Sequence, residues 1–69
     1  MPKVEVIVKI DDASLNKMLE IAEECKIAGM TVEGQMSAVG MISGSIDHGN
    51  ICKIEQIKGV TYVEESKPI

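Results

Sequence analysis

A weak internal repeat is the feature that most limits what this chain can fold into. Six positions between Ile10 and Ile21 recur, identical or chemically similar, thirty-six positions later between Ile46 and Ile57. Their shared pattern is I-D-x-x-x-[LI]-x-K-[MI]-x-x-I. Because 69 residues leave room for only one small domain, the repeat predicts a single domain over residues 1–69, made of two similar halves.

Each copy of the repeat predicts the start of a helix. Asp11 and Asp47 are expected to act as N-cap residues, with their carboxylates accepting hydrogen bonds from free backbone N–H groups. The helices should cover about residues 12–28 and 48–58 and stop at Gly29 and Gly59. The apolar side of the first helix is predicted to carry Leu15, Met18, Leu19, Ile21, Ala22 and Cys25.

Strands are predicted before and after each helix. Residues 4–10 alternate between apolar and more polar positions, as expected for a strand with one buried face. Residues 31–37 and 39–46 form two more, joined by a tight turn near Ala38, and residues 60–65 form the fourth. Right-handed crossovers then place both helices on one face of a four-stranded antiparallel sheet, which is an α+β, ferredoxin-like βαββαβ sandwich.

The face of this sheet without helices is the predicted functional surface. A period of two places Met41, Ser43, Ser45 and Tyr62 there, together with Ile7. The opposite, core-facing set is Val6, Val8, Ile42 and Ile46. Gly40 and Gly44 are expected to thin the third strand, so that a partner's backbone or helices can approach this surface closely. Of the methionines, Met18, Met30 and Met36 are predicted to fill the core, with Met41 as the exception.

The second half of the chain resembles a known family. The segments ISGSID at residues 42–47 and KGVTYVEES at residues 58–66 are similar to the propeptide and inhibitor family of subtilisin-type serine proteases, which shares the βαββαβ order. The resemblance implies a non-enzymatic, fold-assisting or inhibitory module whose open sheet packs on two surface helices of a protease.

The resemblance also implies roles for residues near the C-terminus. Glu64 matches a family carboxylate that caps exposed helix N-termini of the protease, and Ser66 stands where a second carboxylate is usual. The tail, ending at Ile69, would lie toward the substrate cleft. Only three residues follow Ser66, fewer than an inhibitory tail of the family has, which weakens the expectation of substrate-like inhibition.

Charge and composition argue against several other partners. A formal net charge of −4 without a Lys or Arg cluster gives no electrostatic basis for binding nucleic acid or a membrane surface. No stretch approaches 18 apolar residues, and no signal peptide is evident, so a cytoplasmic protein is expected.

No set of residues predicts catalysis or a cofactor. His48 should begin the second helix as an exposed side chain, with no aligned Ser or Cys nucleophile. Glu64 and Glu65 are adjacent on a strand and should point to opposite faces, which does not suit an acid/base pair.

Two alternative functions stay open at this point. The chain could be a self-associating structural or small-ligand regulatory domain, a homo-oligomer in which two open sheet faces stack or edge strands pair. Alternatively, Cys25 and Cys52 with His48 could bind a soft metal, although neither cysteine lies in a C-x-x-C motif and two unpaired thiols are the simpler expectation.

Overall fold

The computed structural model describes residues 3–66, in which four strands alternate with two short helices, each preceded by a 3₁₀ segment. The order of elements is β1 (Lys3–Ile10), η1 (Asp12–Lys17), α1 (Met18–Ile27), β2 (Thr31–Met36), β3 (Met41–Asp47), η2 (His48–Asn50), α2 (Ile51–Glu55) and β4 (Val60–Ser66). Within this range, no helix is both long enough and apolar enough to cross a membrane.

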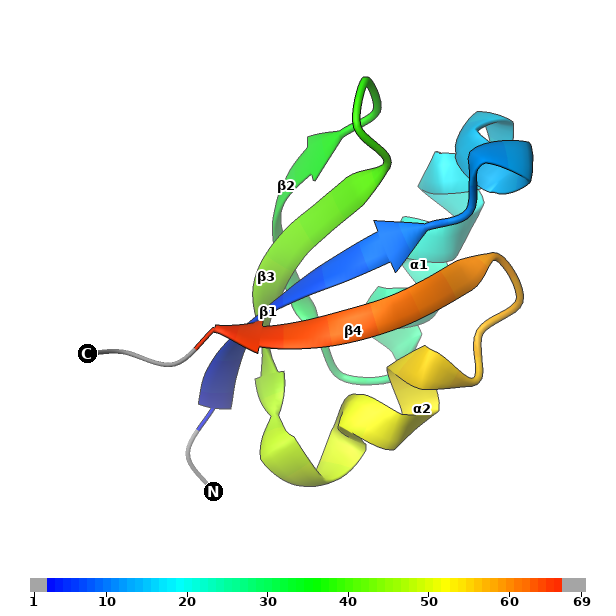
Figure 1. The fold of residues 1–69 in the computed structure, drawn as a ribbon. Helices are drawn as coiled ribbons and strands as arrows, with labels where there is room; N and C mark the ends of the chain where they lie inside the picture. The colour runs from blue at the N-terminus through cyan, green and yellow to red at the C-terminus, as the bar shows by residue number, and fades with distance from the viewer. Residues whose placement is uncertain (1–2, 67–69) are drawn as a thin grey trace.

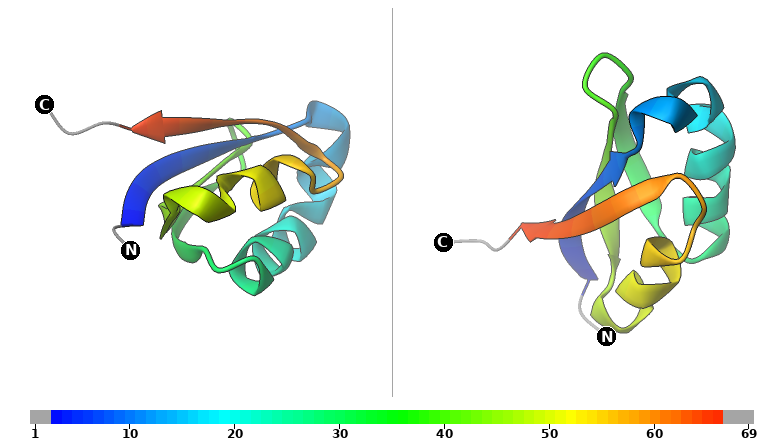
Figure 2. Two further views of the ribbon diagram at one scale, coloured as in Figure 1. Left: turned by 90° about the horizontal axis from the view of Figure 1, so that it is seen from below. Right: turned by 45° about the vertical axis from the view of Figure 1, so that its right-hand side comes forward.

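The four strands form one antiparallel sheet with the order β2-β3-β1-β4. Both helices lie on the same side of this sheet, as the two views of Figure 2 show, and the other side carries no helix (Figure 1). This is the α+β, ferredoxin-like arrangement that the order of elements predicts, and it is confirmed.

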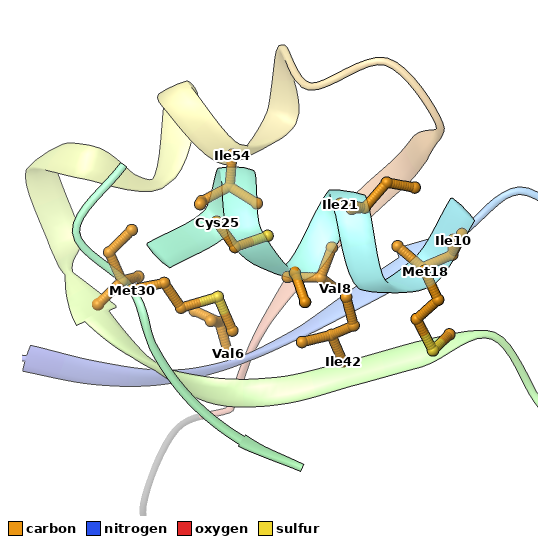
Figure 3. Close-up of a cluster of buried hydrophobic side chains, with 11 residues drawn as sticks. Val6, Val8, Ile10, Met18, Ile21, Cys25, Met30, Ile42 and Ile54 are labelled. Carbon is orange, nitrogen blue, oxygen red and sulfur yellow. The ribbon is translucent and has the colours of Figure 1, made fainter. Parts of the chain in front are cut away.

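The hydrophobic core fills the space between the sheet and the helices. Val6, Val8 and Ile10 alternate along β1 with more exposed residues, as expected for a strand with one buried face. Figure 3 shows the helix residues Cys25 and Ile54 on the side of the core opposite these strand residues. Within residues 3–66, the buried hydrophobic residues of the core are Val6, Val8, Ile10, Met18, Ile21, Ala22, Cys25, Met30, Ile42, Ile46 and Ile54.

Both helices begin differently from the prediction. Asp11 and Asp47 occupy the N-cap positions, but neither side chain makes a capping hydrogen bond. Instead, the Ser14 backbone N–H donates to the Asp11 carbonyl oxygen at 2.8 Å. Hydrogen bonds of this kind, between residues three apart, pair free N–H groups at the helix start with backbone carbonyls instead of side chains. The chain therefore enters each helix through a 3₁₀ turn.

The 3₁₀ segment before α1 also explains why the prediction that Leu19 lies on the apolar side of the first helix is wrong. Leu19 is 74% exposed, whereas Met18, Ile21 and Cys25 are buried. A 3₁₀ segment turns farther per residue than an α-helix. The six residues of η1 therefore change the rotational phase of α1 from that of one continuous helix, and Leu19 faces away from the sheet.

The glycine stop is confirmed for α1, where Gly29 follows the C-cap residue Ala28, but not for α2, which ends at Glu55 and leaves Gly59 in the turn before β4. The two strands of the hairpin are also shorter than predicted. Gly29 and Gly59 have φ of 105° and 99°, a left-handed conformation that a residue with a side chain adopts at a cost. β2 ends at Met36 and β3 begins at Met41, so a four-residue turn, closed by Gly40 at φ 67°, replaces the tight turn expected at Ala38.

Candidate protein-binding interface

The uncovered side of the sheet, called the outer face below, is built from alternate residues of all four strands. The register pairs Ile7 of β1 with Ser43 of β3 on one side and with Glu64 of β4 on the other. Strand alternation then fixes the remaining members. The outer face consists of Lys3, Glu5, Ile7, Lys9, Thr31, Gly34, Met36, Met41, Ser43, Ser45, Asp47, Tyr62 and Glu64.

The structure brings five of the seven predicted binding residues to the outer face. Met41, Ser43 and Ser45 are half-buried along β3, and Tyr62 is 50% exposed on β4. Glu64 is exposed two residues farther along the same strand.

The two remaining predicted residues lie at or beyond the end of β4. Ser66 is its last residue, and its backbone is in register with Glu5. Ile69 lies outside the described residues.

Several residues of the outer face were not among the predicted binding residues, although they share the same alternation. Lys9 lies between Met41 and Tyr62 and donates a hydrogen bond to the carbonyl oxygen of Val39. Lys3 donates to Thr31 Oγ1 at 3.2 Å, so its side chain extends over β3 toward β2. The period of two that places Lys9 on the same face as Ile7 extends to Lys3 as well.

Side-chain size divides the outer face into two halves. β1 and β4 contribute large side chains, which we call the ridge: Glu5, Ile7, Lys9, Tyr62 and Glu64. The middle of β2 and β3 contributes small residues, which we call the trough: Gly34, Ser43 and Ser45. Because the small residues are neighbours across two strands, a partner can approach the backbone closely over the trough while it contacts larger side chains on the ridge.

Glycine contributes to the trough at a different position from the one predicted. Gly44 points to the helix side, where a Cβ would overlap the carbonyl oxygen of Thr31 and lie 2.9 Å from Met30 Cε. Gly40 belongs to the turn before β3. The glycine of the outer face is Gly34, which lies at a bulge of β2, with room for a Cβ limited by Ser43 Oγ at 3.0 Å.

Another methionine also belongs to this surface. Met36 was predicted to fill the core, but it is 45% exposed and is in register with Met41 on the outer face. Met18 and Met30 do lie in the core, as predicted. One end of the outer face therefore presents two methionines beside Lys9 and Tyr62.

The two adjacent glutamates of β4 point to opposite sides, as predicted. Glu65 lies on the helix side, where its Oε1 is 3.7 Å from His48 Nε2. Glu64 lies on the outer face, and the ion pairs found within residues 3–66 do not include it. Glu64 is thus an exposed carboxylate that is free to interact with a partner.

No model of a known protein family matches this chain, and no curated protein does so.

Two hollows lie on the helix side of the molecule. One of about 380 Å³ is lined by residues of η1, α1, β2 and the β2–β3 turn, including Leu15, Leu19 and Gln35. Another of about 290 Å³ lies between α1 and Lys58. Neither includes a residue of the outer face.

The cysteines are two free thiols in different environments. Cys25 is buried in the core and Cys52 is exposed on α2. Burial, with a smaller contribution from the charge of Glu24, raises the pKa of Cys25 to about 11. Among residues 3–66 there is no group of three or more His, Cys, Asp or Glu side chains that could hold a metal ion.

Proposed function

We propose that this protein is a non-enzymatic binding module whose outer face docks on a subtilisin-type serine protease. The observation that carries the proposal is the one-sided sheet, which leaves Tyr62 half-exposed and Glu64 exposed on the side without helices. Tyrosine is one of the residue types enriched in binding hot spots.

The two segments that resemble protease propeptides support the same surface. Residues 42–47 lie in β3, and most of residues 58–66 lie in β4. These strands flank β1 on its two sides, so Ser43 and Ser45 lie on one side of Ile7 and Tyr62 and Glu64 on the other. The outward-facing residues of the two family-like segments therefore belong to a single surface, although they come from separate parts of the chain.

The charges of the outer face favour a protein partner. Two lysines, Lys3 and Lys9, are mixed with three carboxylates, Glu5, Asp47 and Glu64. A surface that mixes both signs lacks the uniform positive potential that phosphate groups select. On the protease, the carboxylate of Glu64 would accept hydrogen bonds from free N–H groups at a helix N-terminus.

The absence of catalysis and a cytoplasmic location are parts of the same proposal. His48 pairs with Glu65 on the helix side, away from the outer face. Cys25 and Cys52 are free thiols, which persist in a reducing compartment.

The direct test is binding to, and steady-state inhibition of, a subtilisin-type protease by the purified protein, with the intact mass followed over the same hours. Tyr62→Ala should weaken binding by about tenfold or more because it removes the aromatic anchor. Glu64→Lys should do the same, because it places a cation at the positive end of a helix.

A matched control is Glu55→Lys, the same charge reversal at an exposed position of α2. It should bind like the parent, and all three variants should keep the parent's circular dichroism spectrum. The proposal fails if the parent protein does not bind the protease at micromolar concentration, or if Tyr62→Ala and Glu64→Lys both bind as the parent does.

A further inference from the structure

The outer face is complementary to itself, which points to a second copy of this chain as a partner. Its ridge and trough lie side by side, with β1 and β4 forming one half and β2 and β3 the other. A two-fold axis that runs parallel to the strands, between β1 and β3, exchanges the two halves. It therefore lays the ridge of each copy into the trough of the other.

The residues that meet in this arrangement follow from the register. Ile7 and Ser43 are direct neighbours within one chain, and the rotation places Ile7 of each copy over Ser43 of the other. At the same level of the sheet, on the two edge strands, Glu64 of each copy faces Gly34 of the other. Large side chains thus face small ones, which is how two sheets fill the space of about 10 Å between them.

The end of the outer face near the hairpin is apolar in the same arrangement. Tyr62 of each copy faces Met36 of the other, and both side chains are about half-exposed in the single chain. Thioether sulfur packs favourably against aromatic rings. This contact would bury the exposed apolar groups at the hairpin end of the outer face.

At the Lys3 end of the outer face, the charges are also complementary under this rotation. Lys3 and Asp47 are in register, so Lys3 of each copy faces Asp47 of the other, and the contact occurs twice. Lys9 of each copy faces the uncharged Met41 of the other. Neither lysine of the outer face is therefore placed opposite another lysine. A two-fold axis perpendicular to the strands through Ile7 would instead place Glu64 on Glu64, which disfavours it.

From this geometry we infer that the chain forms a two-fold dimer through outer face on outer face, with Lys3 of each copy paired to Asp47 of the other. The inference does not rest on binding to a protease. If both hold, the dimer must open before the outer face meets another protein.

Charge exchange between copies gives the sharpest test. Sedimentation equilibrium should show that Lys3→Asp and Asp47→Lys each weaken self-association by about tenfold or more, because each replaces two attractive contacts with two repulsive ones. A one-to-one mixture of the two variants should restore the dimer. In that mixture the contacts between copies are again opposite in charge, while the neighbouring charges within each chain stay alike.

Two further variants distinguish dimerisation through the outer face from dimerisation through another surface. Ser43→Arg places a large side chain in the trough and should leave the protein monomeric. Lys53→Asp, a charge reversal at an exposed position of α2, should dimerise like the parent. Circular dichroism establishes that each variant is folded, and the mixing experiment stands without Ser43→Arg if that variant does not fold.

The inference is overturned if the parent protein is monomeric up to about 1 mM, if Ser43→Arg folds and still dimerises, or if mixing restores nothing. A monomer that binds a subtilisin-type protease would overturn the dimer alone. A dimer of this kind that binds no protease would overturn the proposed function alone.

Discussion

At the scale of single residues, Gly44 shows how a neighbouring strand can dictate an amino acid. Its register partners are Val6 on β1 and Val32 on β2, and its Cα faces the helix side between them. Met30 and Thr31 pass so close to it that a Cβ has no room. The glycine is required by packing, since its own φ is not in the left-handed range.

Replacing Gly44 with alanine should therefore destabilise the protein. Forcing one methyl group into this contact is expected to cost about 1–3 kcal/mol of unfolding free energy, because Thr31 backbone must move. Urea unfolding followed by circular dichroism measures it. Gly49→Ala is the matched control, since no atom lies within 4 Å of its added Cβ, and a loss equal to that of Gly44→Ala would contradict the explanation.

The two cysteines are expected to differ in reactivity because one is buried and the other is exposed. A thiol must be ionised to react as a nucleophile. With a pKa of about 11, roughly one Cys25 side chain in a thousand is ionised at pH 8, and core packing also blocks access to it.

Alkylation at pH 8 should therefore modify one thiol per folded chain quickly and the second one slowly. Peptide mass analysis should place the fast site at Cys52, which is exposed. In denaturant both thiols should react at similar rates, because unfolding removes the burial that raises the pKa of Cys25. Equal rates in the folded protein would show that Cys25 is accessible.

At the scale of elements, α2 depends on tertiary contacts for its existence. It has five residues, far fewer than an isolated helix needs in water. Its one buried side chain is Ile54, which is 0% exposed and lies opposite Cys25 in the core (Figure 3). Ile54 is therefore the main anchor of α2, supported by the partly buried Ile51, which also packs against the core.

Ile54→Ala should cost about 2–5 kcal/mol of unfolding free energy, which is a large part of what a domain of this size has. Thermal or urea unfolding measures the loss. Ile54→Val, with an expected cost of about 0.5–1.5 kcal/mol, covers the case in which the alanine variant does not fold. Glu55→Ala, at the next and exposed position, should change stability by less than about 0.5 kcal/mol. Equal effects at the two positions would refute the anchoring role.

At the scale of the whole molecule, β1 is the strand that holds the sheet together. It pairs with β3 on one side and with β4 on the other, and it supplies Val6, Val8 and Ile10 to the core. β2 lies at an edge, and its pairing with β3 is interrupted by a bulge between Val32 and Gly34. Stability should therefore be highest in the centre of the sheet and lowest at the β2 edge.

Native-state hydrogen exchange checks this distribution. The backbone amides of Val6 and Val8 should exchange only through global unfolding, and so report the full unfolding free energy. Amides of β2 near Glu33 should exchange through local opening at a lower free energy. Slower exchange at Glu33 than at Val8 would contradict the central role of β1.

Local signals in the sequence determined the order of elements and the two faces of the sheet. Alternation along residues 4–10 separates the Val8 face from the Ile7 face without any other part of the chain, because side chains of a strand must alternate. Gly29 ends the first helix through a backbone conformation that belongs to glycine itself. The candidate residues Met41, Ser43, Ser45, Tyr62 and Glu64 follow from the same alternation.

Contacts between distant segments decided what the sequence alone left open or predicted wrongly. The phase of α1, which exposes Leu19, was set by the 3₁₀ entry, whose Leu15 packs against the core. The need for glycine at position 44 comes from Met30 and Thr31 on a neighbouring segment. The division of the outer face into ridge and trough depends on which strands are neighbours, and strand order is a property of the folded chain that no local pattern contains.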